Sequence, residues 1–359
     1  MTGRERFLKT ARGELKGELF LPFNLNYGWF MEETLERWRA EGMPPGVDPL
    51  EFFGFDRIEF TGGRPYSLLP PFQEVVVSED AETQVIRDGT GVTKRVFKAH
   101  GQSKMPQWLD FPVKSRQDFE ALKKRLDPDD PSRYPADWSA AAAKWRTRTH
   151  PLGLGPGSFF GHTLQRWVGT ENLCVLFHDD PGLVHDMLDY LERFFLRLVE
   201  RFTQHLQFDF ASFGEDIAFK GRSFLSPAMF RRFIQPHYVS LCQRLRACGV
   251  ETIFVDSDGY IDDLIPLWME VGINGFSPLE VAAGTNPLGL KERYGDALVL
   301  AGCIDKRALI HGQDAIEREV KKAKQLLDAG GYFPAVDHSV PPDVPLANFR
   351  YFLERLRDA

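Results

Sequence analysis

Residues 253–260 read Ile-Phe-Val-Asp-Ser-Asp-Gly-Tyr, so three apolar residues run directly into two acids separated by one serine. A short apolar run that ends at a glycine is typical of a buried strand. In parallel α/β folds, ligands bind at the carboxyl ends of the strands. The stretch therefore predicts a dry strand whose last acids, Asp256 and Asp258, stand at the rim of a site.

The alternation of strand and helix continues on both sides of this stretch. We expect further strands at 209–213, 273–277, 298–304 and 332–336, with helices between them. Ser226-Pro227 opens one of these helices, which continues to about Cys248, with serine as the N-cap and proline at the first helical position. Strand–helix units with short links imply a parallel sheet, and their number favours a (β/α)8 TIM barrel, an α/β fold in which residues 1–359 form one domain.

The first 150 residues predict an extension to this barrel. A helix at 2–16, a first strand at 19–25 and a helix at 31–41 are expected. Residues 72–100 contain three strand-like runs, and Asp88-Gly89-Thr90-Gly91 is a hairpin turn signal between the last two. We interpret this segment as an antiparallel β-hairpin excursion that covers one mouth of the barrel. Such an excursion could support a homodimer, although no residue argues for that contact.

The composition disfavours several classes of partner. The chain has 44 basic and 51 acidic residues, a net charge of −7, and no dense basic cluster, so nucleic acid and anionic membranes are poor partners. No apolar run reaches the ~20 residues that span a bilayer, and the N-terminus lacks an apolar signal segment. Four scattered cysteines without a CxxC pair fit a reducing compartment. We therefore expect a cytoplasmic protein.

Acidic residues collect at the predicted strand ends. The ends of barrel strands converge on one mouth, so these side chains are expected to lie near one another. Unpaired carboxylates crowded there would repel one another unless a cation, a shared proton or a positive substrate compensates them. The strand-end group comprises Glu215, Asp216, Asp256, Asp258, Glu280, Asp305, Asp337 and His338.

A divalent metal is one such cation. The predicted ligand set is Asp256, Asp258, His338 and Glu215, and mixed oxygen and nitrogen ligands suit zinc, manganese or iron. Two alternatives stay open. The Asp-Ser-Asp-Gly stretch could be a turn in which Asp256 or Ser257 caps the next helix. Acid–base chemistry is the other, with Glu215 and Asp256 as the catalytic candidates.

Polar and aromatic residues near the candidate strand ends are the predicted substrate contacts. His162 is explained equally well as an ordinary histidine of a loop or helix start. The sequence contains no P-loop, GxSxG, HExxH or CxxC motif, so these chemistries are not expected. The predicted contacts are Asn24, Trp29, Phe160, His162 and Tyr260.

Several short motifs occur in a specific order along the chain. They read Gly-Ser-Phe-Phe-Gly at 157–161, Ser-Pro-Ala-Met-Phe at 226–230, Gly-Cys-Ile-Asp at 302–305, Gly-Gly-Tyr at 330–332 and Pro-Pro-Asp-Val-Pro at 341–345. Together with the strand end described above, they resemble the uroporphyrinogen decarboxylase superfamily. The resemblance implies a single (β/α)8 barrel with its site at the carboxyl ends of the strands.

The resemblance implies one of two chemistries. The decarboxylases of the superfamily hold the carboxylates of a tetrapyrrole with an arginine-bearing loop near the first strand. Here residues 22–30 contain no arginine, and an acidic mouth disfavours a substrate with many carboxylates. A decarboxylase of uroporphyrinogen III or of a smaller carboxylic acid is therefore the alternative.

The other branch is similar to corrinoid-dependent methyltransferases, which hold zinc on a His-x-Cys pair and a late Cys. Here Asp256-Ser257-Asp258-Gly259 stands in place of the pair, and Asp337-His338 in place of the late Cys. Harder ligands favour an oxygen substrate over a thiol. We expect an O-demethylase-like methyltransferase that uses zinc or another divalent metal on a small methoxylated, for example aromatic, compound. It would pass the methyl group to a corrinoid (cobalamin) protein. A non-catalytic barrel that binds a corrinoid or tetrapyrrole is a further alternative.

Overall fold

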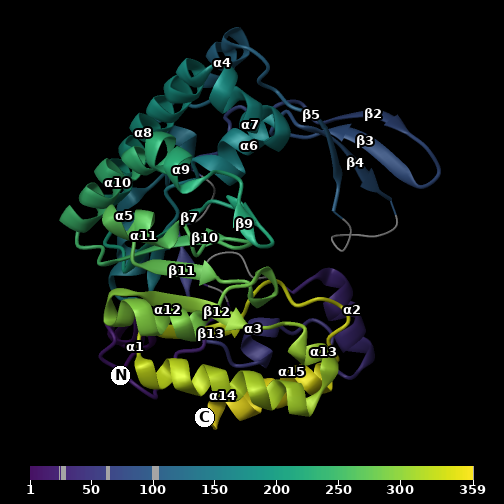
Figure 1. Cartoon of the computed structure of the whole chain (residues 1–359), viewed down its shortest axis with the longest axis vertical. Coiled ribbons are helices and arrows are strands. Elements are labelled where there is room, and N and C mark those ends of the chain that lie inside the picture. The colour runs from purple at the N-terminus through teal and green to yellow at the C-terminus, as the bar shows by residue number, and fades with distance from the viewer. Residues whose placement is uncertain (24, 26–29, 62–64, 99–104, 359) are drawn as a thin grey trace.

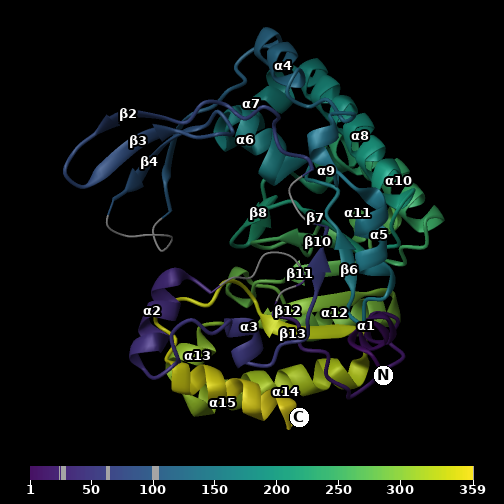
Figure 2. The same ribbon diagram turned by 180° about the vertical axis from the view of Figure 1, so that it is seen from behind.

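The computed structural model describes residues 1–23, 25, 30–61, 65–98 and 105–358 (Figures 1 and 2). Within these residues, a curled sheet of seven strands forms the centre of the molecule, and every neighbouring pair in it is parallel. The predicted parallel α/β architecture is thus confirmed. In spatial order the strands are β1 (Glu59–Phe60), β6 (Leu152–Leu154), β7 (Phe210–Gly214), β10 (Thr252–Ser257), β11 (Gly275–Pro278), β12 (Val299–Ile304) and β13 (Tyr332–Val336).

The first predicted strand, at 19–25, is not a regular strand in the described residues. Pro22 makes only an isolated parallel bridge with Asp56. Leu21 accepts a hydrogen bond from the backbone of Asp56 (2.8 Å) but donates its own N–H to the Asp56 side chain (2.8 Å). Because a carboxylate replaces a backbone acceptor and proline has no N–H to donate, the ladder stops there. The fold is barrel-like, with a bridged segment beside β1 in place of a regular eighth strand.

Aromatic rings fill the inside of the curled sheet. Phe210, Phe254 and Phe333, from β7, β10 and β13, belong to one buried cluster with Phe7 of α1 (Gly3–Ala11). The ring of Phe7 lies 4.9 Å from that of Phe333 and 5.0 Å from that of Phe210. Such rings bury a large apolar area and pack a barrel interior solidly. With the amino-terminal part of the sheet filled in this way, its carboxyl edge remains for a site.

Amphipathic helices cover the outside of the sheet (Figures 1 and 2). In α8, buried residues recur at helical spacing from Leu183 to Phe202, which gives the helix one apolar face toward the sheet. None of the helices in the described ranges combines the length and apolar character that crossing a bilayer demands. The helices after α1 are α2 (Glu32–Ala40), α3 (Pro49–Phe52), α4 (Arg116–Lys123), α5 (Trp138–Arg146), α6 (Gln165–Val168), α7 (Thr170–Asp179), α8 (Pro181–Thr203), α9 (Pro227–Phe233), α10 (Gln235–Ala247), α11 (Ile265–Glu270), α12 (Pro287–Tyr294), α13 (Ala308–His311), α14 (Gln313–Ala329) and α15 (Leu346–Arg357).

The helix predicted from Ser226 to about Cys248 begins as expected but is divided in two. The Ser226 hydroxyl accepts a hydrogen bond from Met229 N (3.2 Å), and Pro227 occupies the first turn. The helix is interrupted at Ile234, which lies between α9 and α10. Pro236 explains the break, because proline has no N–H for the helical ladder and fits only the first turn of a new helix.

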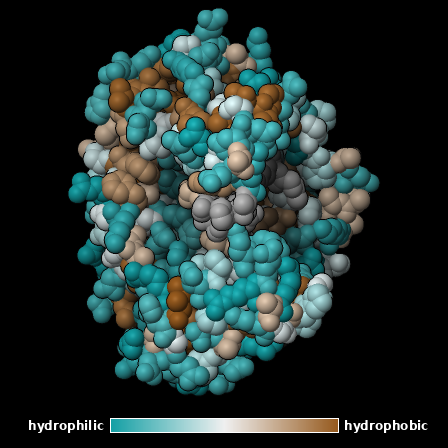
Figure 3. Space-filling view, turned by 90° about the vertical axis from the view of Figure 1, so that its right-hand side faces the viewer, coloured by the Kyte–Doolittle hydropathy of each residue, from teal (hydrophilic) through white to brown (hydrophobic). Residues whose placement is uncertain are grey.

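A second sheet, of four antiparallel strands, projects from the body of the molecule (Figures 1 and 2). Three of its strands fall on the expected runs, and the fourth lies beyond the predicted segment 72–100. The face from which this sheet projects is mostly hydrophilic, with hydrophobic side chains in scattered patches (Figure 3). The strands are β2 (Val75–Glu79), β3 (Thr83–Arg87), β4 (Thr93–Phe97) and β5 (Gln107–Asp110).

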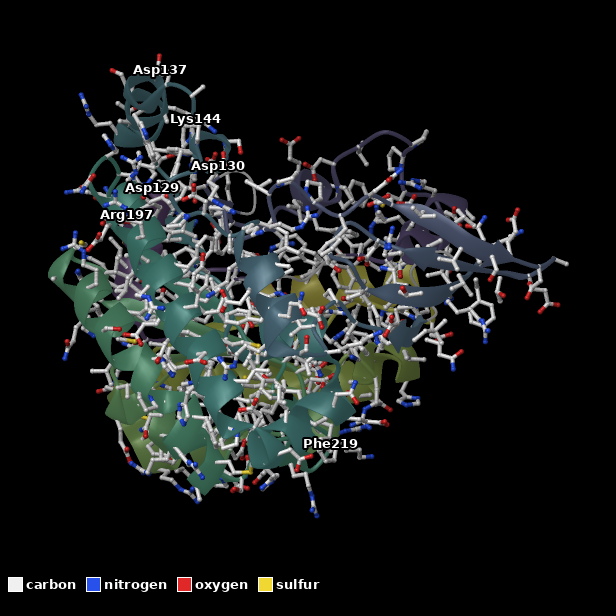
Figure 4. All side chains as sticks on the ribbon, turned by 90° about the horizontal axis from the view of Figure 1, so that it is seen from above. Asp129, Asp130, Asp137, Lys144, Arg197 and Phe219 are labelled. Atoms are coloured by element: carbon white, nitrogen blue, oxygen red, sulfur yellow. The ribbon has the colours of Figure 1, made fainter. Side chains whose placement is uncertain are left out.

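Ion pairs attach the segment around α5 to the rest of the chain. Asp129 pairs with Arg197 of α8 at 2.9 Å, and Lys144 of α5 pairs with Glu59 of β1 at 2.6 Å. In Figure 4 the labelled side chains of Asp129, Lys144 and Arg197 lie at the upper left, and Phe219 lies at the bottom. Phe219 belongs to the short hairpin formed by β8 (Ala218–Phe219) and β9 (Arg222–Ser223).

Candidate functional site

A cavity of about 570 Å³ opens at the carboxyl ends of the central strands. Asp256 and Asp258 line it from the end of β10, and His338 lines it from the loop that follows β13. A second wall comes from the base of the antiparallel sheet, through the β3–β4 turn and the strands beside it. Residues of that wall include Asp88, Gly89, Thr90, Lys94 and Trp108.

Asp258, Glu280 and His338 form a compact group of possible metal ligands. Each offers one ligand atom, and these atoms all lie within 4.8 Å of one another. His338 Nε2 is 3.2 Å from Asp258 Oδ2, and this hydrogen bond raises the pKa of the imidazole. Glu280 accepts from Gly259 N at 2.9 Å and lies 3.4 Å from Lys306 Nζ. Two carboxylates and one imidazole are a donor set that fits a divalent metal such as zinc.

Only part of the predicted ligand set is in this group. Asp258 and His338 belong to the predicted ligand set, whereas Glu280 is one of the strand-end acids outside that set. The sequence places Glu280 two residues beyond Pro278, the last residue of β11, and this position is the signal that could have included it. Strand ends of a curled sheet converge, so an acid just past each end is a candidate.

Asp256 lines the cavity but lies outside the three-residue group. Its side chain is 9% exposed and accepts a hydrogen bond from Ser277 Oγ at 2.5 Å. Asp256 and Ser277 are direct partners in the β10–β11 register, so the sheet itself orients the carboxylate. Asp256 is therefore a further acid of the cavity wall, next to the candidate metal ligands but not one of them.

Glu215 is placed differently from the expectation that it would bind metal or act in catalysis. It is fully buried, and its carboxylate accepts from Phe159 N and Phe160 N, both at 2.7 Å, and from the Tyr238 hydroxyl. Burial raises its pKa to about 7. These donors already occupy the carboxylate oxygens, so Glu215 holds the backbone at Phe159 and Phe160, in the segment that follows β6. Glu215 is not among the described residues that line the cavity.

Asp216, one residue further on, is the acid from the end of β7 that lines the cavity. Its carboxylate lies 3.3 Å from His162 Nε2 and accepts from Asp258 N at 3.3 Å. Burial raises its pKa. Its backbone has a φ of 37°, a left-handed conformation that is uncommon outside glycine. The turn that follows β7 therefore directs Asp216 into the cavity wall, while the metal and catalytic roles predicted for Glu215 stay predictions.

The predicted substrate contacts are divided in the structure. His162 lines the cavity as part of the pair with Asp216. Phe160 is fully buried, with its ring centroid 6.0 Å from that of Phe224, and Tyr260 is half-buried, with its backbone N–H bound to Phe219 O (3.1 Å). Neither residue is among the described cavity-lining residues. Asn24 and Trp29 lie outside the described residues.

Comparison with curated proteins gives partial matches. Uroporphyrinogen decarboxylases of Thermus thermophilus and Syntrophotalea carbinolica are 30% and 29% identical to this chain. The matches cover 37% and 36% of this chain, and 38% and 37% of the relatives. The chain therefore spans less than two fifths of the length of the curated relatives it matches.

Comparison with solved structures gives a weak likeness. A B12-independent methionine synthase from Shewanella sp. W3-18-1 superposes with a TM-score of 0.29 and 12% identity, over 62% of this chain and 65% of that one. A likeness of this size carries no argument about activity. The model of the uroporphyrinogen decarboxylase (URO-D) family matches residues 106–359, which is well over half of the sequence. On that match, this chain belongs to the uroporphyrinogen decarboxylase family.

Proposed function

We propose that this member of the URO-D family is a metal-dependent methyltransferase that demethylates a small methoxylated compound. The observation that carries the proposal is the group of Asp258, Glu280 and His338 beside the cavity. A volume of about 570 Å³ is within the range of small-molecule sites. A ligand set of oxygen and nitrogen donors suits an oxygen substrate better than a thiolate, which prefers sulfur-rich sites.

The side chains of this site divide into holding and proton-transfer roles. A divalent cation such as zinc, held by Asp258, Glu280 and His338, would supply Lewis acidity toward the ether oxygen of the substrate. Asp256 lines the same cavity and, in its protonated form, gives a proton to the leaving oxygen. Ser277 orients that carboxyl group through its 2.5 Å hydrogen bond. His162, which lies in the π-helical turn Phe160–Leu164 and pairs with Asp216, would contact the substrate from another part of the cavity wall.

The reaction transfers one methyl group. The carbon–oxygen bond of the ether would break, and its electron pair would stay on the oxygen, which takes a proton from Asp256. A reduced, cobalt(I) corrinoid carried by a partner protein would supply the electron pair of the new bond to the methyl group. The product is an alcohol or a phenol. The partner and its corrinoid are part of the proposal and derive from the resemblance of the 256–259 strand end to the corrinoid-dependent branch.

Metal analysis combined with a demethylation assay tests this function. The purified protein is stripped with a chelator, reloaded with zinc, manganese or iron(II), and mixed with methoxybenzenes and a reduced corrinoid protein. We expect demethylation only after reloading, and its loss in His338→Ala. A stripped protein that retains full activity would exclude the metal role. Reloaded protein that demethylates none of the compounds would exclude the methyltransferase.

Decarboxylation of a carboxylic acid is a second candidate function. It is favoured by the names of the curated relatives and by Arg166, a cation that lines the cavity. Uroporphyrinogen III carries many carboxylates, which would meet Asp216, Asp256 and Asp258 on the cavity wall. A smaller acid suits the cavity better. Release of carbon dioxide by protein without metal or corrinoid would favour this candidate.

A further inference from the structure

Arg166 presents a positive charge to the cavity, and no counter-ion among the described residues is in contact with it. It belongs to α6, directly after the π-helical turn Phe160–Leu164, and is half-buried. Its guanidinium carbon lies 4.2 Å from the centre of the Trp108 ring of β5. Within the part of the chain that the structure describes, its guanidinium makes this ring contact but neither a hydrogen bond nor an ion pair. Its fork of N–H donors is therefore available to a ligand.

The acids nearest to Arg166 are held by other groups. Asp216 lies 3.3 Å from His162, and Asp88 lies 2.8 Å from Lys94 and accepts from Thr90 N at 2.9 Å. Both acids favour the charged form of Arg166 from a distance, whereas burial lowers its pKa. A guanidinium stays charged in proteins, and a partly buried charge is stabilised by an opposite charge. An anion that enters the cavity would therefore stabilise Arg166.

We propose that Arg166 and Trp108 form a subsite that binds a carboxylate group of the substrate. A carboxylate is planar and matches the guanidinium fork with two parallel hydrogen bonds. The contact with the Trp108 ring, 4.2 Å from the guanidinium carbon, holds the fork at the cavity wall. Asp216, Asp256 and Asp258 line the same cavity and repel negatively charged groups. The site therefore favours a substrate with a single carboxylate, bound at Arg166. This step rests on the proposed function: if the enzyme demethylates a methoxylated compound, the subsite identifies that compound as a methoxylated monocarboxylic acid, such as a methoxybenzoate.

Ligand binding tests the subsite independently of catalysis. The full chain, without corrinoid protein, is titrated calorimetrically with 3-methoxybenzoate and 4-methoxybenzoate, and with 4-methoxybenzamide as the neutral match. Inorganic phosphate is the second anion. We expect the better benzoate to bind at least about tenfold more tightly than the amide, since hydrogen bonds to charged groups contribute more than neutral ones. Arg166→Met removes this preference, and Arg166→Lys keeps only part of it.

The control variant is Arg222→Met, an exposed arginine on β9 that is not among the residues lining the cavity. It is expected to bind both probes like the unmodified chain. The subsite is overturned by equal affinity for acid and amide, by a preference that survives Arg166→Met, by tighter binding of phosphate than of either benzoate, or by no benzoate binding up to about 10 mM. Thermal melting shows whether Arg166→Met folds; if it does not, Arg166→Lys decides.

This experiment separates the subsite from the proposed function. Binding needs neither a metal nor a methyl acceptor. A benzoate preference that depends on Arg166, together with failed demethylation, would retain the subsite and remove the methyltransferase. Demethylation of neutral methoxybenzenes without any benzoate preference would retain the methyltransferase and remove the subsite.

Discussion

His338 Nε2 lies 3.2 Å from Asp258 Oδ2, although 80 residues separate the two in the chain. Their strands, β13 and β10, are not neighbours, because β11 and β12 lie between them. In a flat sheet, three spacings of about 4.8 Å would hold the two strand ends about 14 Å apart. The contact therefore depends on the curl of the sheet, which also brings Glu280, just beyond β11, into the group.

Removal of His338 should remove the bound metal. His338→Ala leaves two carboxylates without their nitrogen partner, and we expect the affinity for zinc to fall at least about tenfold. Elemental analysis of the purified variant and a competitive zinc titration measure this. Asp305→Asn is the matched control, since Asp305 follows β12 but pairs with Arg307 at 2.7 Å and lies outside the ligand group. A His338→Ala protein that keeps one tightly bound metal per chain would contradict the assignment.

Gly259 positions Glu280 through its N–H, so an added Cβ there should damage both the fold and the site. A Cβ would lie 2.6 Å from the backbone of Ala218 and Phe219, and φ is +85°. Gly221→Ala is the control, with φ of +86° and open space around its Cβ. We expect Gly221→Ala to cost about 1–2 kcal/mol through φ alone, and Gly259→Ala clearly more. Urea unfolding of both variants compares them, and equal losses would show that the backbone clash relaxes freely.

The sequence predicted those parts of this fold that depend on local pattern. Buried runs such as 253–257 alternate with amphipathic segments such as α14, and both periods are visible without any knowledge of contacts. The cap at Ser226 is likewise local, since the hydroxyl meets an N–H three residues later. The break at Ile234 also has a local cause in Pro236, a signal that the prediction of one continuous helix did not use. By contrast, the Asp56 carboxylate that ends the pairing of Leu21 lies 35 residues away in the chain, so its effect depends on tertiary geometry.

The candidate site shows the same division. Asp258 and His338 could be named because each follows an apolar strand directly. Which of the adjacent residues Glu215 and Asp216 lines the cavity could not be predicted, because only the turn after β7 decides which of the two faces inward. Arg166 carries no sequence signal, since its importance comes from Trp108, 58 positions earlier, on a separate sheet.

Glu215→Gln should change the pH dependence of stability in a defined direction. The pKa of Glu215 is raised by burial from 4.5 to about 7. The folded state therefore holds a proton that the unfolded state releases, so this stabilisation is complete below pH 4.5 and is lost as the pH rises through 7. The glutamine side chain of the variant does not titrate. The advantage of the unmodified chain over the variant in free energy of unfolding should shrink over this window, by about 3 kcal/mol.

Urea unfolding of both proteins at several pH values between 4 and 8 measures this difference. Glu317→Gln serves as the control, because hydrogen bonds with Arg355 and Tyr351 on the surface lower the pKa of Glu317. Its difference from the unmodified chain should not shrink between pH 4.5 and 7. A Glu215→Gln difference that is constant, or that grows with pH, would mean that Glu215 is already ionised in the folded protein at low pH.

Asp256→Asn distinguishes proton transfer from metal binding at this residue. The capping alternative is excluded, because Asp256 lies within β10 and the next helix, α11, has Leu264 at its N-cap and no side-chain cap. Asp256 lies outside the three-ligand group, so metal content should remain that of the unmodified chain. A group that protonates the leaving oxygen contributes about 10²–10⁴-fold to the rate, and we expect a loss of that order in single-turnover demethylation with saturating metal.

Ser277→Ala provides the comparison for this loss. It removes the hydrogen bond that orients Asp256 but keeps the carboxyl group, so the rate should fall by less than about tenfold. Elemental analysis of both variants accompanies the assay. Reduced metal content in Asp256→Asn would move Asp256 into the ligand set. A rate within about threefold of the unmodified chain, with full metal, would exclude proton transfer by Asp256, because a rate factor that small is far below what proton transfer supplies.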